Sequence, residues 1–109
     1  MTGMLCRNGG KKGKGMKLWL LRPMDGLAKN DNPWEPWYDK AFGFVVRAEA
    51  EEEARKFAHE KAGDENRGVF LGGKIADTDS PWLDAKYSTC TELLPEGEAG
   101  VVMQDFAAA

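Results

Sequence analysis

Three aspartates in the segment DTDSPWLD have the spacing closest to a catalytic or cation-binding site: Asp77, Asp79 and Asp84. Carboxylates gathered in a loop can bind a divalent cation or act as general acid and base. A calcium-binding EF-hand loop also needs Gly at its sixth position and Glu at its twelfth, but counting from Asp77 gives Trp82 and Ser88. The segment therefore predicts aspartates that cap turns. A small enzyme or enzyme subunit that uses these carboxylates is an alternative.

The remaining candidates for chemistry are one histidine and two cysteines. His59 lies in a predicted helix without an orienting partner or a nucleophile at a suggestive spacing. Cys6 and Cys90 form no Cys-x-x-Cys pair and lack the further ligands of a zinc site, so we expect two free thiols. No glycine-rich segment fits a phosphate-binding pattern. The sequence therefore predicts no catalytic residue, no cofactor and no metal.

Aromatic side chains gather in the segment DNPWEPWYDK, which we call the Trp loop (residues 31–40). Prolines stiffen this segment, so its tryptophans can form a lid over the sheet or a rigid anchor for a partner. The two interpretations are compatible, and we expect Trp37 to be the lid and Trp34 the exposed anchor. The predicted partner-binding residues are Trp34, Glu35, Trp37, Tyr38 and Asp39.

Charge divides the chain into a basic tail and an acidic body. Residues 1–15 carry four basic side chains and no acid, and the whole chain of 109 residues has a net charge of −3, so the remainder is at −7. We expect residues 1–15 to be a disordered tail rich in Gly and Lys, and residues 16–109 to form a single domain. The tail is either an extension upstream of a start at Met16 or an arm that seeks phosphate.

The composition also bears on partners and location. No apolar run reaches the ~20 residues that cross a bilayer, and no secretory signal is evident, so we expect a cytoplasmic protein without membrane contact. An acidic body is not expected to bind nucleic acid directly, except through the 1–15 tail. Its surface could instead mimic a phosphate backbone.

The strongest predicted elements are a strand followed directly by a helix. The helix of residues 50–62 has Ala54, Phe57 and Ala58 on one stripe, which we expect to face the sheet, with His59 facing solvent. The complete pattern predicts an α+β domain in which one main helix packs on a small four- to five-stranded mixed sheet, in the order strand, long loop, strand, helix, strand, strand. The predicted strands are 17–22, 41–48, part of 69–76, 87–94 and 101–106.

The segment FGFVVRAEAEEEARKFAHEKAGDE resembles short uncharacterised bacterial and phage- or prophage-encoded proteins in which a Phe-Val-Val-x-Ala strand feeds a Glu-Glu-Ala-Arg helix. An opening strand like MKLWLLRP and a closing segment like PWLDAKYSTCTEL extend the resemblance over most of residues 16–106. It implies the same α+β fold and no catalytic residues. Some small phage proteins that inhibit host defence complexes have a similar plan, which implies inhibition by binding.

These patterns lead to one functional prediction with two alternatives. We expect a small non-enzymatic module that binds a protein partner through the Trp loop and an acidic surface. The first alternative is an inhibitor of a host defence or nucleic-acid-processing complex that acts by acidic mimicry. The second is the carboxylate enzyme described above.

Overall fold

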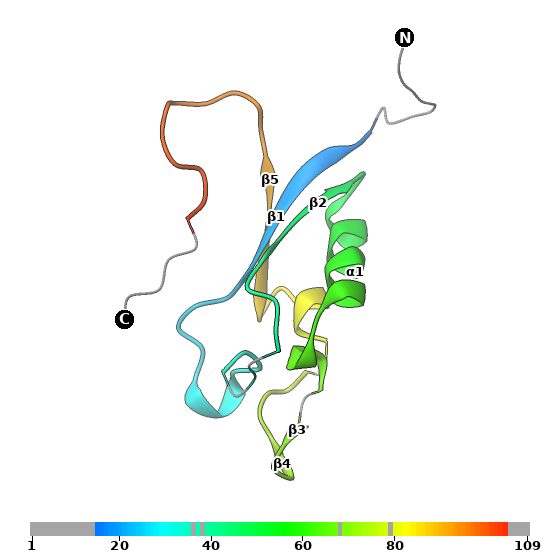
Figure 1. The fold of residues 1–109 in the computed structure, drawn as a ribbon, viewed down its shortest axis with the longest axis vertical. Coiled ribbons are helices and arrows are strands. Elements are labelled where there is room, and N and C mark those ends of the chain that lie inside the picture. The colour runs from blue at the N-terminus through cyan, green and yellow to red at the C-terminus, as the bar shows by residue number, and fades with distance from the viewer. Residues whose placement is uncertain (1–14, 36, 38, 68, 79, 105–109) are drawn as a thin grey trace.

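The structure is a computed structural model that describes residues 15–35, 37, 39–67, 69–78 and 80–104. One α-helix packs on a three-stranded antiparallel sheet, and a two-stranded ribbon extends from one end of the molecule (Figure 1). The predicted α+β class is confirmed. The predicted four- to five-stranded mixed sheet is not, because the main sheet has three strands.

The elements follow the predicted order, with the ribbon inserted after the helix. The strands and the helix are β1 (Lys17–Pro23), β2 (Phe44–Ala48), α1 (Glu51–Lys61), β3 (Val69–Phe70), β4 (Gly73–Lys74) and β5 (Ser88–Leu93). Three short 3-10 turns, at Lys29–Asp31, Asp64–Asn66 and Pro81–Leu83, lie in the connections.

The strand β1 lies in the centre of the sheet, with β2 on one side and β5 on the other. Leu21 of β1 is opposite Phe44 of β2 and Cys90 of β5, and both pairings are antiparallel. After β2 the chain forms α1, and it later rejoins the sheet as β5, on the other side of β1 from β2. A parallel pairing between the strand before the helix and one after it therefore does not form, because β1 separates them.

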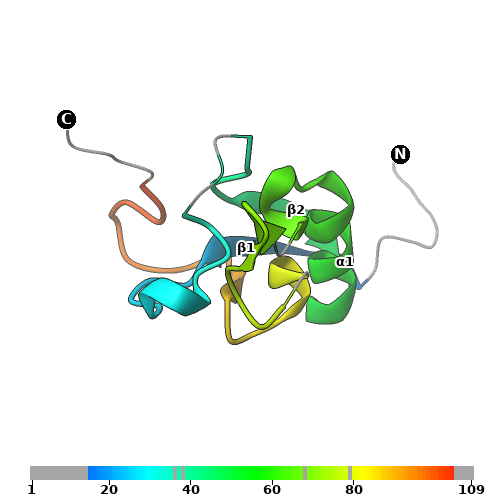
Figure 2. The ribbon, with the colours of Figure 1, turned by 90° about the horizontal axis from the view of Figure 1, so that it is seen from below.

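The two faces of the sheet have different neighbours. Side chains alternate along a strand, so Leu21 and its pairs Phe44 and Cys90 point to the same face. This face packs against the core, whereas the opposite face carries Leu20 and the exposed Val45. Figure 2 shows α1 on one side of the sheet and the C-terminal segment after β5 on the other.

The core centres on Trp82, which lies on the 3-10 turn between the ribbon and β5 and is fully buried. The ring of Trp82 meets the rings of Trp34 and Phe44 edge-on, with centroids 4.8 and 5.0 Å apart. Edge-on contacts between aromatic rings stabilise the fold more than the burial of their surface area alone would. A single helix covers only part of the sheet, so the Trp loop and the turn that carries Trp82 complete the cover.

Two predicted strands do not join the sheet. The 69–76 segment folds back on itself as the β3–β4 ribbon, because Leu71 and Gly72, at φ of 54° and 80°, form the two-residue turn of a tight hairpin. The predicted strand 101–106 has no strand among its described residues, 101–104, and 105–106 lie outside them. Pro95 follows β5 almost at once and cannot donate a ladder hydrogen bond.

The structure bears on two further expectations. Residues 1–14 of the predicted tail lie outside the described residues, and Gly15 is exposed. Among the described helices, none has both the length and the apolar character that a bilayer crossing requires.

Candidate functional site

Both tryptophans of the Trp loop are buried, with exposed fractions of 6% for Trp34 and 8% for Trp37. The Trp34 indole N–H donates to the carbonyl oxygen of Tyr87 at 3.0 Å. The Trp37 ring lies 5.6 Å from the guanidinium of Arg67. The prediction that Trp34 is an exposed anchor is therefore wrong. Its large indole is more stable in the core, where the N–H also finds an acceptor, so the loop is a lid at both positions.

The other predicted partner-binding residues lie at the edge of this lid. Glu35 and Asp39 are exposed, and Tyr38 lies outside the described residues. The carbonyl oxygen of Asp39 accepts a hydrogen bond from the Asp64 amide at 2.6 Å and lies so close to Gly63 that a β-carbon there would overlap it. The lid is thus tied to the end of α1. Partner binding by these residues stays a prediction, but the prediction was based on an exposed Trp34 indole, and that indole is buried.

The aspartate cluster separates into single carboxylates with local partners. Asp77 pairs with Lys74 at 2.8 Å, and this hydrogen bond lowers the pKa of the Asp77 carboxyl. Asp84 accepts from the backbone N–H of Lys86 at 2.9 Å, which is the turn-capping role predicted for it. Asp79 lies outside the described residues. A carboxylate with a lowered pKa stays ionised at neutral pH and is a poor proton donor.

Asp31 accepts three hydrogen bonds that tie the start of the Trp loop to the segment before β5. The donors are Lys86 at 2.8 Å, the Tyr87 hydroxyl at 2.6 Å and the Asp77 amide at 3.0 Å. The Lys86 bond first, then those from Tyr87 and Asp77, lower the pKa of Asp31 from 3.8 to about 2. Stabilisation of the charged form by donors explains this direction. The arrangement is that of a structural tie.

The histidine and the described cysteine show no sign of a reactive site. His59 is half-buried, so the expectation that it faces solvent is only partly met, and its Nδ1 has no hydrogen-bond partner in the described part of the chain. Cys90 is a free thiol whose pKa is raised by burial, which disfavours the reactive thiolate. Among the described residues, no group of His, Cys, Asp and Glu could hold a metal ion.

The rotation of α1 about its axis is set by a buried arginine. Arg55 donates to the Ser88 hydroxyl at 2.8 Å, to the carbonyl oxygen of Trp82 at 3.1 Å and to the carboxylate of Glu51 at 2.8 Å. Ala54 and Ala58 are also buried, so the contact face of the helix runs through positions 51, 54, 55 and 58.

Phe57 is consequently outside the contact face, and 44% of it is exposed. The prediction that Phe57 docks the helix is wrong. At 100° per residue, Phe57 lies on the far side of Ala54 from Arg55. The hydrogen bonds of the guanidinium turn the helix toward Arg55, and the small side chains of Ala54 and Ala58 let it approach the sheet closely.

A second buried charge fixes the end of α1. Glu65 is fully buried, and its carboxylate accepts from the Trp82 indole N–H at 2.8 Å and from the amides of Ala41 and Gly63 at 3.0 and 2.9 Å. It therefore joins the chain after the Trp loop, the chain after α1 and the core. A carboxylate with three donors in a site closed to water is strongly held.

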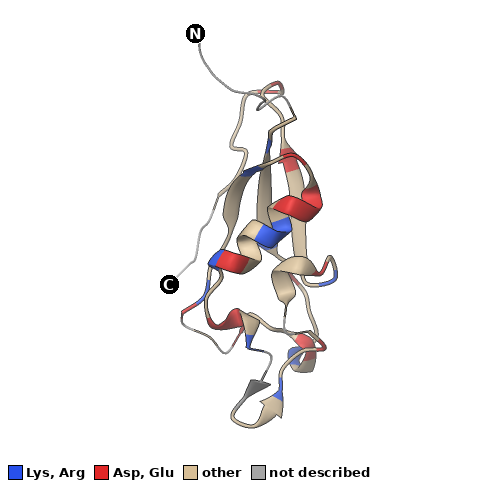
Figure 3. Cartoon of the chain, turned by 90° about the vertical axis from the view of Figure 1, so that its right-hand side faces the viewer, with Lys and Arg blue, Asp and Glu red and all other residues tan. Residues whose placement is uncertain are grey.

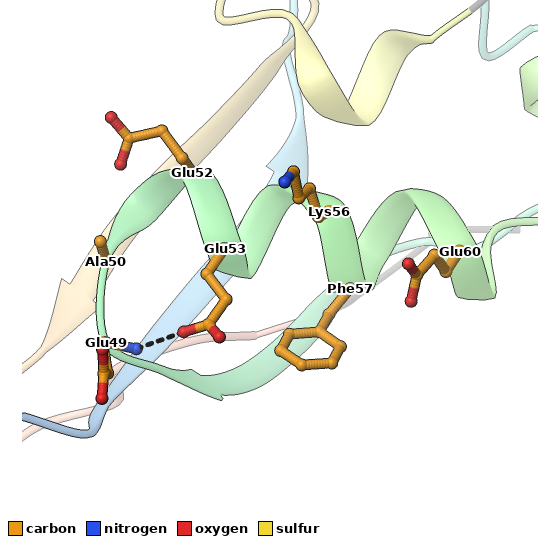
Figure 4. A pocket seen from close by; sticks show the side chains of 7 residues that line it. All are labelled: Glu49, Ala50, Glu52, Glu53, Lys56, Phe57 and Glu60. Carbon is orange, nitrogen blue, oxygen red and sulfur yellow. Dashed lines mark hydrogen bonds between the residues drawn. The ribbon is translucent and has the colours of Figure 1, made fainter.

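The outward side of α1 forms an open groove of about 480 Å³, which we call the α1 groove. It is lined by Glu49, Ala50, Glu52, Glu53, Lys56, Phe57 and Glu60. Figure 4 shows the Phe57 ring between Glu53 and Glu60 on one side of the helix. Four glutamates and one lysine give the lining a charge of −4 + 1 = −3.

Of the groove glutamates, Glu53 is held by the backbone. Glu53 accepts from the Glu49 amide at 2.8 Å, which caps the first turn of the helix. Glu52 and Glu60 form no ion pair with any described side chain, and Lys56, one turn after Glu52, forms none either. Acidic and basic positions on α1 are marked in Figure 3. The groove thus has an apolar ring at its centre and solvated carboxylates around it.

Only some of the residues that line this groove could be predicted from the sequence to lie on an exposed surface. The glutamates of the first turn are visible there, but Phe57 was assigned to the buried stripe by its spacing from Ala54. The residue that could have indicated the correct helix face is Arg55. It follows Glu51 by four residues and pairs with it, and a helix can bury such an arginine only when this side of the helix faces the core. The acceptors at Trp82 and Ser88 are distant in sequence, so spacing alone does not reveal them.

The chain matches no protein-family model, no curated protein and no solved structure.

Proposed function

We propose that this protein is a non-enzymatic binding module that takes a basic polypeptide segment of a partner on the α1 groove. The observation that carries this proposal is the half-exposed Phe57 ring, which is flanked by Glu53 and Glu60. An aromatic side chain of this size is usually buried in a folded domain. An aromatic ring with polar groups around it is a common centre of a protein interface.

The charge of the groove specifies the chemistry of the partner. Carboxylates that lack an ion-pair partner can each attract a Lys or Arg side chain without first breaking a bond. Exposed ion pairs contribute little affinity one by one, so Phe57 supplies the apolar contact and the glutamates supply steering and register. The segment that fits combines several basic residues with at least one apolar side chain.

The inhibitor alternative uses the same carboxylates. The nucleic-acid-binding groove of a partner protein is basic, and it could bind Glu52, Glu53 and Glu60 in place of phosphates. The biological effect would then be to block that groove. The proposed binding chemistry does not depend on this outcome. The proposal does not use the indoles of Trp34 and Trp37, because both are buried in the core.

The proposal is tested with a short amidated peptide that carries four lysines and one leucine, called here the basic peptide, and with a twin in which glutamates replace the lysines. Binding to the full chain is measured by fluorescence anisotropy at low and high salt. We expect the basic peptide to bind at low salt, to weaken as salt screens the charges, and its twin not to bind.

Two variants with the same change in charge locate the site. Glu53→Gln/Glu60→Gln should weaken binding about three- to tenfold, since each exposed pair contributes about 0.2–1 kcal/mol. Glu96→Gln/Glu98→Gln, which changes exposed residues in the segment after β5, is the matched control and should bind like the wild-type chain. Equal losses in both variants, or no binding of the basic peptide, would reject the proposal.

A further inference from the structure

The chain enters the fold beside the α1 groove. The first residue of β1, Lys17, is opposite Ala48, and the next residue after Ala48 is Glu49, which lines the groove. Gly15 lies beside the same side chain, since a β-carbon added to Gly15 would be 3.7 Å from Cγ of Glu49. The segment that precedes Gly15 therefore starts at one end of the groove.

The charge of that segment is opposite to the charge of the groove. Residues 1–14 contain four basic side chains, Arg7, Lys11, Lys12 and Lys14, and no Asp or Glu. The groove lining has a charge of −3. In addition, Met1, Met4 and Leu5 lie at the far end of the segment and could contact an apolar ring.

The length of the segment also suits the groove. An extended chain spans up to about 3.3 Å per residue, so residues 1–14 can reach roughly 45 Å from Gly15. The eleven residues of α1 extend about 16 Å. A segment of this length can follow the helix from Glu49 to Glu60 and reach Phe57 on the way.

We infer that residues 1–14 bind the α1 groove of their own chain and compete with the basic segment of a partner. This inference rests on the proposed function, because it names a regulator of the same site. Tethering raises the local concentration of the segment to the millimolar range, so weak ion pairs are enough for partial occupancy. Salt weakens these pairs, and a partner with higher affinity displaces the segment.

Cys6 lies within the segment and provides a position for a spin label, once Cys90 is replaced by Ala or Ser in the full chain. We expect the label to broaden the amide signal of Glu60 more than that of Thr91. The two residues are at similar distances along their elements: Glu60 lies about 16–17 Å along α1 from Glu49, which is beside Gly15, and Leu20, which pairs with Thr91, lies about 16–17 Å along β1 from Gly15. Thr91 reports the opposite side of the sheet.

The variant that replaces Arg7, Lys11, Lys12 and Lys14 with Gln should lose the preference for Glu60, as should the wild-type sequence at high salt. Lys29→Gln/Arg47→Gln removes exposed charge elsewhere and should keep it. Equal broadening at Glu60 and Thr91 in the wild-type sequence, or a preference that survives neutralisation, would overturn the inference.

Mixing labelled chains with unlabelled, isotope-enriched chains separates binding in cis from binding to a second copy. Broadening seen mainly in the mixture would also overturn the inference.

Affinity for the basic peptide separates this inference from the proposed function. The Gln variant of the tail should bind the basic peptide roughly two- to tenfold more tightly than the wild-type chain, because the competing segment is gone. Equal affinities would reject competition in cis and leave the proposed function intact. Failure of the basic peptide to bind either protein would reject the proposed function itself.

Discussion

At the residue scale, the fold depends on two buried charges whose partners are backbone and side-chain groups distant in sequence. Arg55 sets the rotation of α1, and Glu65 holds the ends of α1 and of the Trp loop against Trp82. Removing one partner of such a bond leaves buried groups unsatisfied, which costs more than the bond contributes. Phe57 and the groove glutamates lie on the outside of α1 because these two residues fix which side of the helix faces the core.

Replacing Glu65 by Ala should lower the free energy of unfolding by about 3–5 kcal/mol, because three buried donors lose their acceptor. Glu65→Gln retains the shape and one carbonyl oxygen, so it should cost less. Urea denaturation of both variants measures the difference. A loss below about 1 kcal/mol for Glu65→Ala would show that these three bonds do not hold the segments together.

Asp31 should make stability depend on pH in the acid range. Its pKa in the folded chain is about 2, below the value near 3.9 of an unfolded chain, so it favours folding above about pH 4 and this contribution is lost as the pH falls toward 2. Asp31→Asn should therefore be less stable than the wild-type chain at neutral pH, with a gap that narrows between pH 4 and pH 2. Denaturation at several pH values measures this gap. A gap between the wild-type chain and Asp31→Asn that stays constant from pH 4 to pH 2 would contradict the lowered pKa of Asp31.

At the element scale, α1 and the ribbon show how local pattern and tertiary contacts combine. The strand–helix join at β2 and α1 could be predicted from alternation and from the glutamates of the first turn, and β1 from its run of four apolar residues. The helix face could not, because the acceptors of Arg55 are about 30 residues away in sequence. The ribbon was missed because Gly72 and Gly73 indicated a break in one strand, not a turn between two.

Phe57→Ala should cost only about 1–2 kcal/mol of stability, not the 3–5 kcal/mol of a buried ring, since nearly half of the side chain is exposed. Arg55→Ala should cost more, about 2–4 kcal/mol, because it leaves buried acceptors at Trp82 and Ser88 without their donor. Urea denaturation ranks the two variants. The opposite ranking would mean that the helix packs through Phe57 after all.

The ribbon turn contains a strained leucine. Leu71 has a φ of 54° and is 91% exposed, a conformation that costs a non-glycine residue about 1–2 kcal/mol and that Asn tolerates better. Leu71→Asn should stabilise the chain by about 0.5–1 kcal/mol. Leu83→Asn, another exposed leucine but without positive φ, should give no such gain. Denaturation midpoints test both, and equal shifts would indicate that strain at Leu71 is not relieved.

At the scale of the whole molecule, the sequence predicted a small α+β domain and an acidic surface, but its expectation that Trp34 is exposed was wrong. Aromatic density in the Trp loop suggested an anchor, but Trp34 and Trp37 are needed to complete a core that one helix cannot cover. Phe57 of α1, by contrast, is half-exposed, although the sequence pattern favoured its burial. Which ring a small core keeps depends on the whole set of contacts.

Amide chemical shifts of the full chain during titration with the basic peptide locate the surface that binds the peptide. We expect the largest shifts on the outer side of α1, at Glu53, Phe57 and Glu60, and smaller shifts in Glu53→Gln/Glu60→Gln. The exposed edge of the Trp loop, at Glu35 and Asp39, should change little. If the largest shifts occurred at that edge and α1 were unchanged, the peptide would bind the Trp loop and not the α1 groove.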